Sequence, residues 1–139
     1  EDQMDIVHAR ARAVLGRYYA RAKENELAMQ YYSGALDILS DQADPHSAVE
    51  VAMLLGQVLS DAGRKDEAAE HYIDALLLAE ANDFRMLQGE LLARLGEVES
   101  DRSQKMDYLQ RSLSVFRELG AVDRMRDVQT SVHKAVMGH

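Results

Sequence analysis

Apolar residues recur along much of this chain at helical spacing, and no strand-like alternation replaces it. In three stretches they fall three and four residues apart, which places them on one face of an α-helix. The stretches are Leu27, Tyr31, Ala35, Ile38 and Leu39, then Ala68, Tyr72, Ala75, Leu76 and Ala79, and then Leu109, Leu113, Phe116 and Leu119. The pattern therefore predicts an all-α chain.

Residues that start or stop helices separate these stretches. Asn25 and the pair Asp44–Pro45 are typical of helix starts, because a short polar side chain caps the free N–H groups and proline fits the first turn. Gly63 and Gly120 are typical of helix ends, and Asn82–Asp83 separates two further helices. We expect seven helices, at residues 4–23, 26–41, 46–62, 65–81, 84–100, 103–119 and 121–137.

The helices form a repeat. Leu15–Gly16, Leu55–Gly56 and Leu95–Gly96 recur 40 residues apart, and residues 26–36 align with 66–76 at the same spacing. The third copy of the second phrase, at 105–113, arrives three residues early, so we expect a distorted third hairpin.

Three helix hairpins are therefore expected in a single domain spanning residues 1–139, at about 4–41, 46–81 and 84–119. The helix at 121–137 has no partner helix in the sequence. We expect it to cap the last hairpin, because an open stack must cover its terminal apolar face.

The repeat resembles the tetratricopeptide repeat family. The matching residues are Leu15, Gly16, Tyr19, Ala28, Tyr32 and Ala35 in the first copy, and Leu55, Gly56, Leu59, Ala68, Tyr72 and Ala75 in the second. The resemblance implies a right-handed α-solenoid in which small residues let paired helices approach closely. The 40-residue spacing is similar to the longer subclass found in kinesin light chain and the Pins/LGN polarity adaptors.

Charge and composition narrow the choice of partner. The 139 residues carry a net charge of −8 from 24 acidic and 16 basic side chains, which disfavours nucleic acid and anionic membranes and favours a partner with a basic segment. No apolar run is long enough to span a membrane. The absence of cysteine fits a reducing compartment, so we expect the cytoplasm. Because Glu1 rather than Met opens the chain, we also expect an excised or processed piece.

Catalytic and metal-binding patterns are absent from the sequence. There is no glycine-rich phosphate loop, nucleophile elbow or zinc-protease motif. Glu67, His71 and Asp74 share a helix face, but a tight metal site needs more converging ligands, so a solvated face is the better interpretation. We expect no enzyme activity, no metal and no cofactor.

The resemblance implies a concave groove lined by the first helix of each repeat. Carried onto this sequence, the lining positions are Arg10, Arg17, Arg21, Met53, Gln57, Asp61, Glu90, Arg94, Glu97 and Asp101. This groove would be basic at its N-terminal end and mostly acidic beyond. The implied function is a scaffold or adaptor that binds a peptide or helical segment of a protein partner, with mixed charge or a basic segment.

Other interpretations stay open. The chain fits a regulatory or ligand-sensing segment of a larger transcription regulator or enzyme, and self-association through an uncovered end of the stack is a third reading. The charged positions also suit a merely solvated surface. The lysine and asparagine clamp with which some family members hold chaperone tails is not reproduced at Ala13 and Arg17.

Overall fold

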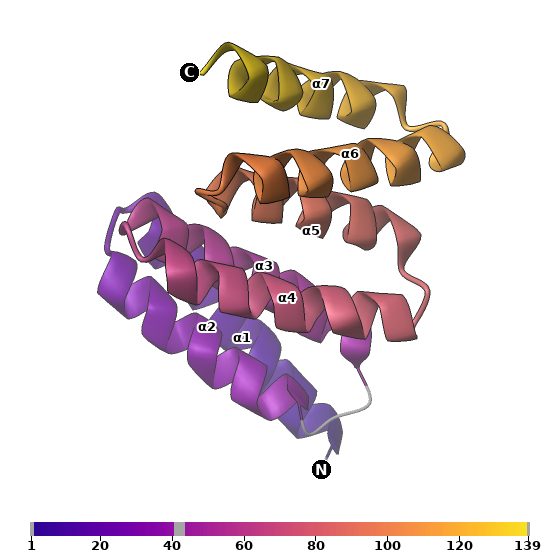
Figure 1. Ribbon diagram of the computed structural model, residues 1–139. Coiled ribbons are helices and arrows are strands. Elements are labelled where there is room, and N and C mark those ends of the chain that lie inside the picture. Colours follow the sequence, from indigo (N-terminus) through magenta and orange to yellow (C-terminus); the bar gives the residue numbers. More distant parts are fainter. Residues whose placement is uncertain (1, 41–43, 139) are drawn as a thin grey trace. The chain divides into compact units, whose positions relative to one another are not determined.

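The computed structural model describes residues 2–40 and 44–138, which form helices and no strand. The helices are α1 (Asp2–Arg21), α2 (Asn25–Ser40), α3 (Pro45–Asp61), α4 (Lys65–Ala81), α5 (Arg85–Val98), α6 (Arg102–Leu119) and α7 (Val122–Met137) (Figure 1). The all-α prediction is confirmed, and each predicted boundary that is described lies within two residues of the observed one. Asp41 and His139 lie outside the described residues.

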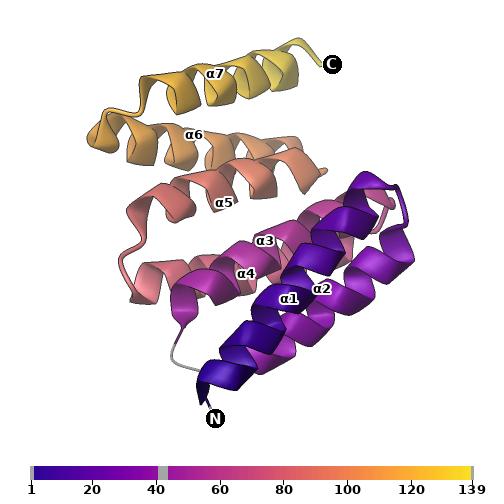
Figure 2. The ribbon, with the colours of Figure 1, turned by 180° about the vertical axis from the view of Figure 1, so that it is seen from behind.

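The chain divides into two compact units, Glu1–His71 and Tyr72–His139, which we call the first and second unit. Helix α4 runs from one into the other. Within the first unit α1 packs on α2 and α2 packs on α3, and within the second α5 packs on α6 and α6 packs on α7 (Figure 2). Within each unit these pairs join helices that are neighbours in sequence, as expected of a helical repeat.

Four of the turns between helices share one backbone shape. A residue with positive φ follows the helix, and the N–H of the next residue donates to a carbonyl five positions back. The left-handed residues are Lys23, Gly63, Asp83 and Gly120, and the bonds are Glu24 to Tyr19, Arg64 to Leu59, Phe84 to Ala79 and Ala121 to Phe116, at 2.8 or 2.9 Å. This turn satisfies the free carbonyls of the helix end and reverses the chain sharply. The helix ends predicted at Gly63 and Gly120 are confirmed.

The predicted helix starts have different outcomes. Asp44 caps α3, because its carboxylate accepts a hydrogen bond from the Ser47 N–H at 3.3 Å, and Pro45 takes the first helical position. Asn25 is instead the first residue of α2, and the Glu24 carbonyl before it accepts the bond from the Ala28 N–H. The cap predicted at Asn25 is therefore wrong by one residue, because the tight left-handed turn puts Glu24 in that position.

Close packing in the first unit depends on Gly16. A Cβ atom at this position would lie 2.6 Å from two ring carbons of Tyr32, nearer than non-bonded atoms approach. The Tyr32 ring is 1% exposed, and Ala28 on the same helix is fully buried. The missing side chain therefore lets α1 and α2 come together, which is the physical reason for the small residues of the repeat.

The third hairpin keeps this close approach and changes its turn. A Cβ at Gly96 would lie 2.6 Å from Leu109, which stands at the eighth position of α6 as Tyr32 does in α2. The α5–α6 connection has extended backbone at Glu99 in place of a left-handed residue. Lys105 replaces the small residue, and its Nζ donates to the carbonyl oxygens of Gly96 and Glu97 at the end of α5. A lysine thus satisfies carbonyls that the other turns satisfy through the backbone.

Helix α7 covers the exposed side of α6. Val128 is buried in one cluster with Leu109, Leu113 and Phe116, and further apolar residues of α7 pack against the cluster. The predicted capping helix is therefore present in the second unit.

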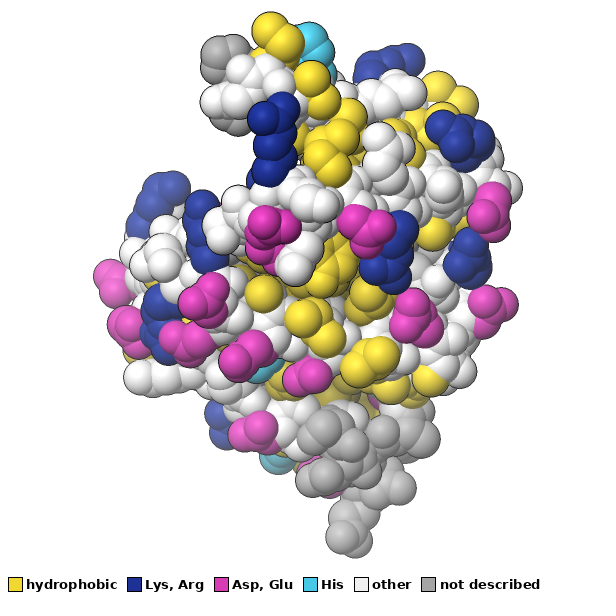
Figure 3. Space-filling view, viewed as in Figure 1, with side chains coloured by type: hydrophobic (Ala, Val, Ile, Leu, Met, Phe, Trp, Pro, Cys, Tyr) yellow, Lys and Arg dark blue, Asp and Glu magenta, His cyan; other side chains and the backbone are white. Residues whose placement is uncertain are grey.

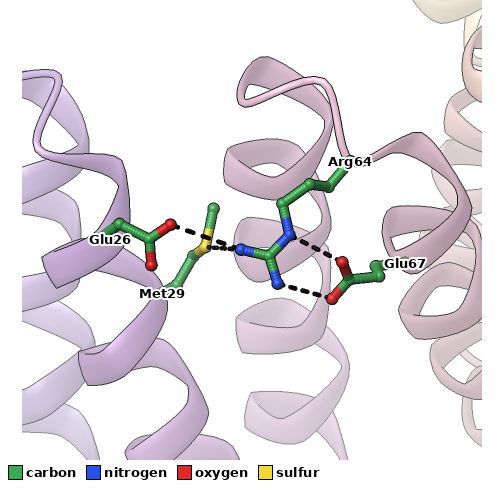
Figure 4. Close-up of polar contacts among 4 residues, drawn as sticks. All are labelled: Glu26, Met29, Arg64 and Glu67. Atoms are coloured by element: carbon green, nitrogen blue, oxygen red, sulfur yellow. Dashed lines mark hydrogen bonds and ion pairs between the residues drawn. The ribbon is translucent and has the colours of Figure 1, made fainter.

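Arg64, in the turn before α4, ties that turn to α2 within the first unit (Figure 4). Its Nε and Nη2 donate to the two carboxylate oxygens of Glu67 at 2.7 and 2.8 Å, while Nη1 lies 3.5 Å from Glu26 and 3.3 Å from the Met29 sulfur. The hydrogen bond from Arg64 lowers the pKa of Glu67, and the same bond raises the pKa of Arg64. The guanidinium thus joins α2 to the first turn of α4 in one polar cluster.

Candidate binding groove

A groove of about 290 Å³ lies in the first unit, between α1, α3 and the end of α2. Its floor is apolar and its rim is charged. The lining residues are Ala9, Arg10, Ala13, Val14, Arg17, Leu39, Ser47, Glu50, Val51 and Leu54. An apolar floor with a few charged groups around it is the usual composition of a site for a peptide or small ligand.

The rim carries two positive charges and one negative charge. Arg10 and Arg17 are exposed and lie two turns apart on α1, and neither takes part in an ion pair within residues 2–40 and 44–138. Glu50 of α3 faces His46 one turn away, with 3.4 Å between its carboxylate and the imidazole Nδ1. The two guanidinium groups are therefore available to a partner's carboxylates.

Tyr32 lies close enough to α1 for positive charges on that helix to affect its pKa. Burial raises the pKa of the Tyr32 hydroxyl, and the positive charges of Arg17 and Arg21 oppose that shift. Tyr32 is therefore a neutral core residue near neutral pH.

The other predicted groove residues of the first unit have other surroundings. Arg21 is exposed in the last turn of α1 and lies outside the groove lining. Gln57 donates to the Asp61 carboxylate one turn on, at 2.9 Å. Met53 is only 6% exposed and belongs to the core. Met53 does not line this groove, and its assignment to a binding surface stays a prediction.

In the second unit, three residues that were predicted to line the groove interact with other residues of the fold. Glu90 pairs with Arg124 of α7. Asp101 caps α6, because its carboxylate accepts from the Gln104 N–H at 2.9 Å. Arg94 is partly buried and already takes part in an interaction. Glu90 and Asp101 therefore help to hold α5, α6 and α7 in place, and their role in binding a partner stays a prediction.

Glu97 lines a second pocket of about 200 Å³ within the second unit. The other lining residues are Gly96, Lys105, Leu109, Ser131, Lys134 and Ala135, and Figure 3 shows the surface hollowed beside the C-terminal end of α7. The Lys105 ammonium is already bonded to carbonyls of α5. This pocket is therefore a weaker candidate than the groove of the first unit.

The sequence reasoning missed most of the groove floor. Leu39 comes from α2 and Leu54 from α3, and both lie within regular apolar stripes that read as core. Only their placement beside the α1 arginines identifies them as part of the groove lining. For Asp101 a signal was present, because an acidic cap with glutamine three residues later is close to a capping box.

The described residues form neither a cluster of metal ligands nor a helix suited to a membrane. Among residues 2–40 and 44–138, no group of three or more His, Asp or Glu side chains is placed to hold a metal ion. None of the helices in the described part of the chain has the length and apolar character to cross a membrane.

Comparisons with known proteins agree on the repeat. Residues 53–114 match the tetratricopeptide repeat family, and the resemblance drawn from the sequence is thereby confirmed. No curated protein sequence matches the chain.

Solved structures with similar folds include three informative cases. BtubC (BKLC) from P. vanneervenii superposes with a TM-score of 0.82 at 18% identity, over 99% of this chain and 64% of that one. Aspartyl phosphate phosphatase F from Bacillus subtilis has a TM-score of 0.76 at 19% identity, over 96% and 41%. A Rap protein complexed with competence and sporulation factor has a TM-score of 0.73 at 20% identity, over 95% and 40%.

These likenesses show the fold and not the activity, because identity is low. The chain spans between 40% and 64% of the length of the three proteins. One of them is named as a phosphatase, and that name describes the longer protein.

Proposed function

Taking as premise that this chain carries tetratricopeptide repeats, matched over residues 53–114, we propose that it is a protein-interaction module binding a segment of a partner protein. The observation that carries the proposal is the groove of the first unit, where Arg10 and Arg17 border an apolar floor. No catalytic residue is assigned, and the partner is recognised through shape, apolar contact and charge.

The groove indicates the chemistry of the partner segment. Arg10 and Arg17 are seven residues apart, so their Cα atoms are separated by about 10 Å along the helix axis. Two acidic residues fit this distance at a spacing of about three in an extended segment or about seven in a helix. Apolar side chains between them would contact Val14 and Leu54, and a basic residue beyond would face Glu50.

Charge-assisted contacts of this kind set register and specificity more than raw affinity. The partner segment is therefore of mixed charge, with acidic residues beside α1. The Rap protein solved with competence and sporulation factor supports the idea that a fold of this type accommodates a bound factor.

The test is a peptide selection followed by measured affinities. Peptides selected on the wild-type chain from a random displayed library are titrated against Arg10→Glu/Arg17→Glu by fluorescence polarisation. We expect at least about a tenfold loss of affinity, equivalent to about 1.4 kcal/mol. The matched control is Arg126→Glu, an exposed arginine on α7, which should bind like wild type. Selected peptides that bind the double variant as well as wild type would show that the groove is not the site.

A second candidate is a regulatory segment of a longer protein, because the chain spans less than two thirds of the three similar structures. The same groove would then receive a ligand whose binding alters another domain. The full-length gene product decides between the two. A second domain whose activity responds to the selected peptide, and no longer responds in Arg10→Glu/Arg17→Glu, would favour the regulatory role.

A further inference from the structure

The face of α1 that points away from α2 is an exposed apolar ridge. Met4, Val7, Val14 and Tyr18 are each more than half exposed, and they recur at intervals of three, seven and four residues. A helix turns about 100° per residue, so these side chains lie opposite Gly16 and its contact with the Tyr32 ring of α2. The helix is therefore apolar on two faces, and the outer one is uncovered within the first unit.

Basic side chains flank this ridge. Arg10, Arg17 and Arg21 follow one side of it at intervals of seven and four residues. In the described part of the chain none of them pairs with a carboxylate, whereas Arg64, Arg85, Arg111, Arg124 and Arg126 all do. The ridge and its arginines together form an apolar, basic surface, which we call the α1 ridge.

An apolar, acidic surface lies on α4 within the second unit. Ile73 and Leu77 are 42% and 60% exposed one turn apart, and the exposed carboxylates of Asp74 and Glu80 lie on either side of them. Neither carboxylate takes part in an ion pair with another described residue. Figure 3 shows acidic and apolar side chains together along this helix. We call this surface the α4 ridge.

We propose that the α1 ridge of one molecule docks on the α4 ridge of a second copy. Apolar side chains meet apolar side chains, and the arginines meet Asp74 and Glu80, so both sets of exposed groups gain partners. Because the two surfaces differ, the contact is heterologous and leads to head-to-tail chains or rings in place of a closed twofold dimer.

The contact is expected to be weak. A pair of single helices buries less area than a standard interface, and the net charge of −8 on each molecule opposes association. Association should therefore develop only towards millimolar concentration. The inference goes beyond the proposed function, since peptide binding in the groove does not require it.

A charge-swap experiment tests the proposal, read out by sedimentation velocity over a concentration series. Variant A is Tyr18→Glu/Arg21→Glu, which makes the α1 ridge acidic, and variant B is Asp74→Arg/Glu80→Arg, which makes the α4 ridge basic. All four positions are exposed, so both variants should fold, as checked by circular dichroism. Variant A keeps Arg10 and Arg17, so retained binding of the selected peptides shows that the groove is intact. Arg126→Glu again serves as the control.

The expected result has three parts. Wild type and the control gain mass with concentration, A and B alone stay monomeric, and an equimolar mixture of A and B associates again because each altered ridge meets its complement. A wild type that remains monomeric at the highest concentration overturns the proposal. So does an unrestored mixture, and so does association that A abolishes and B leaves intact, which would indicate symmetric pairing through α1.

Discussion

Replacing Gly16 with alanine places one methyl group between α1 and α2. The new Cβ would lie 2.6 Å from the Cδ1 and Cε1 atoms of Tyr32, and the ring cannot move aside easily because it is 1% exposed. Overpacking of this kind costs about 1–3 kcal/mol. Alanine is also the better helix former, by about 1 kcal/mol, so the net loss is about 0–2 kcal/mol.

Gly34 on α2 provides a matched control in the same hairpin. A Cβ there would lie 2.9 Å from the Arg12 Nη1 atom, which is the far end of an exposed, flexible side chain. Arg12 can move away, so Gly34→Ala should gain up to about 1 kcal/mol from helix propensity. The stability of the two variants should therefore differ by about 1–3 kcal/mol, which is the overpacking term alone.

Urea denaturation followed by circular dichroism at 222 nm measures both variants. A second comparison isolates the contact. In a Tyr32→Ala background the overpacking cost of Gly16→Ala should vanish, because the ring is gone. The reasoning fails if Gly16→Ala is stabilised as much as Gly34→Ala, or if its cost is the same with and without the Tyr32 ring.

The remaining predictions concern turns, caps and pH. Asp83→Gly should raise the free energy of unfolding by about 1 kcal/mol, because Asp83 has a φ of +57° that glycine adopts without strain. Gly63→Ala should lower the free energy of unfolding by a similar amount, although an added Cβ there meets no other atom. Urea midpoints equal to that of wild type would contradict both predictions. Asp101→Ala should lower the free energy of unfolding by about 1 kcal/mol, because it removes the cap of α6. A melting temperature equal to that of wild type would contradict this prediction. Arg64 lowers the pKa of Glu67 in the folded protein, so the stability that Glu67 contributes is present above its ordinary pKa and is lost as the pH falls through the lowered value. Glu67→Gln should therefore reduce the loss of stability between neutral and acidic pH. A pH profile of stability equal to that of wild type would contradict the role of the Arg64–Glu67 pair.

The turns show how far local sequence reaches. Gly63 and Gly120 mark two helix ends correctly because the left-handed turn is a local backbone conformation that glycine favours. Lys23 and Asp83 take the same conformation in equivalent turns. Aspartate is among the residues that adopt it most readily, and Asn82–Asp83 marked a boundary in the sequence, whereas lysine at position 23 gives no such signal. At Lys23 the turn, closed by the hydrogen bond from the Glu24 N–H to the Tyr19 carbonyl, holds a residue type that does not favour this backbone.

The groove shows where periodicity is insufficient. Arg10 and Arg17 line the groove of the first unit, whereas Met53, assigned to a groove by the same offsets, is buried. A position in a repeat specifies a direction around its own helix. Whether that direction meets solvent or a neighbouring helix depends on the angle at which the helices pack.

The number, order and limits of the helices were determined by the sequence alone, because helical periodicity, caps and turn residues act over a few neighbouring positions. The close approach of α1 and α2 was also predicted from the sequence, because Gly16 and Ala28 are small residues at the positions where the repeat brings its two helices together. Only the tertiary structure decided which charges are available to a partner. Glu90 of α5 pairs with Arg124 of α7, while Arg10 and Arg17 border Leu39 of another helix. Those contacts join residues that are far apart along the chain and close together in the fold. Sequence patterns act over a few neighbouring positions, so they do not show which charges meet.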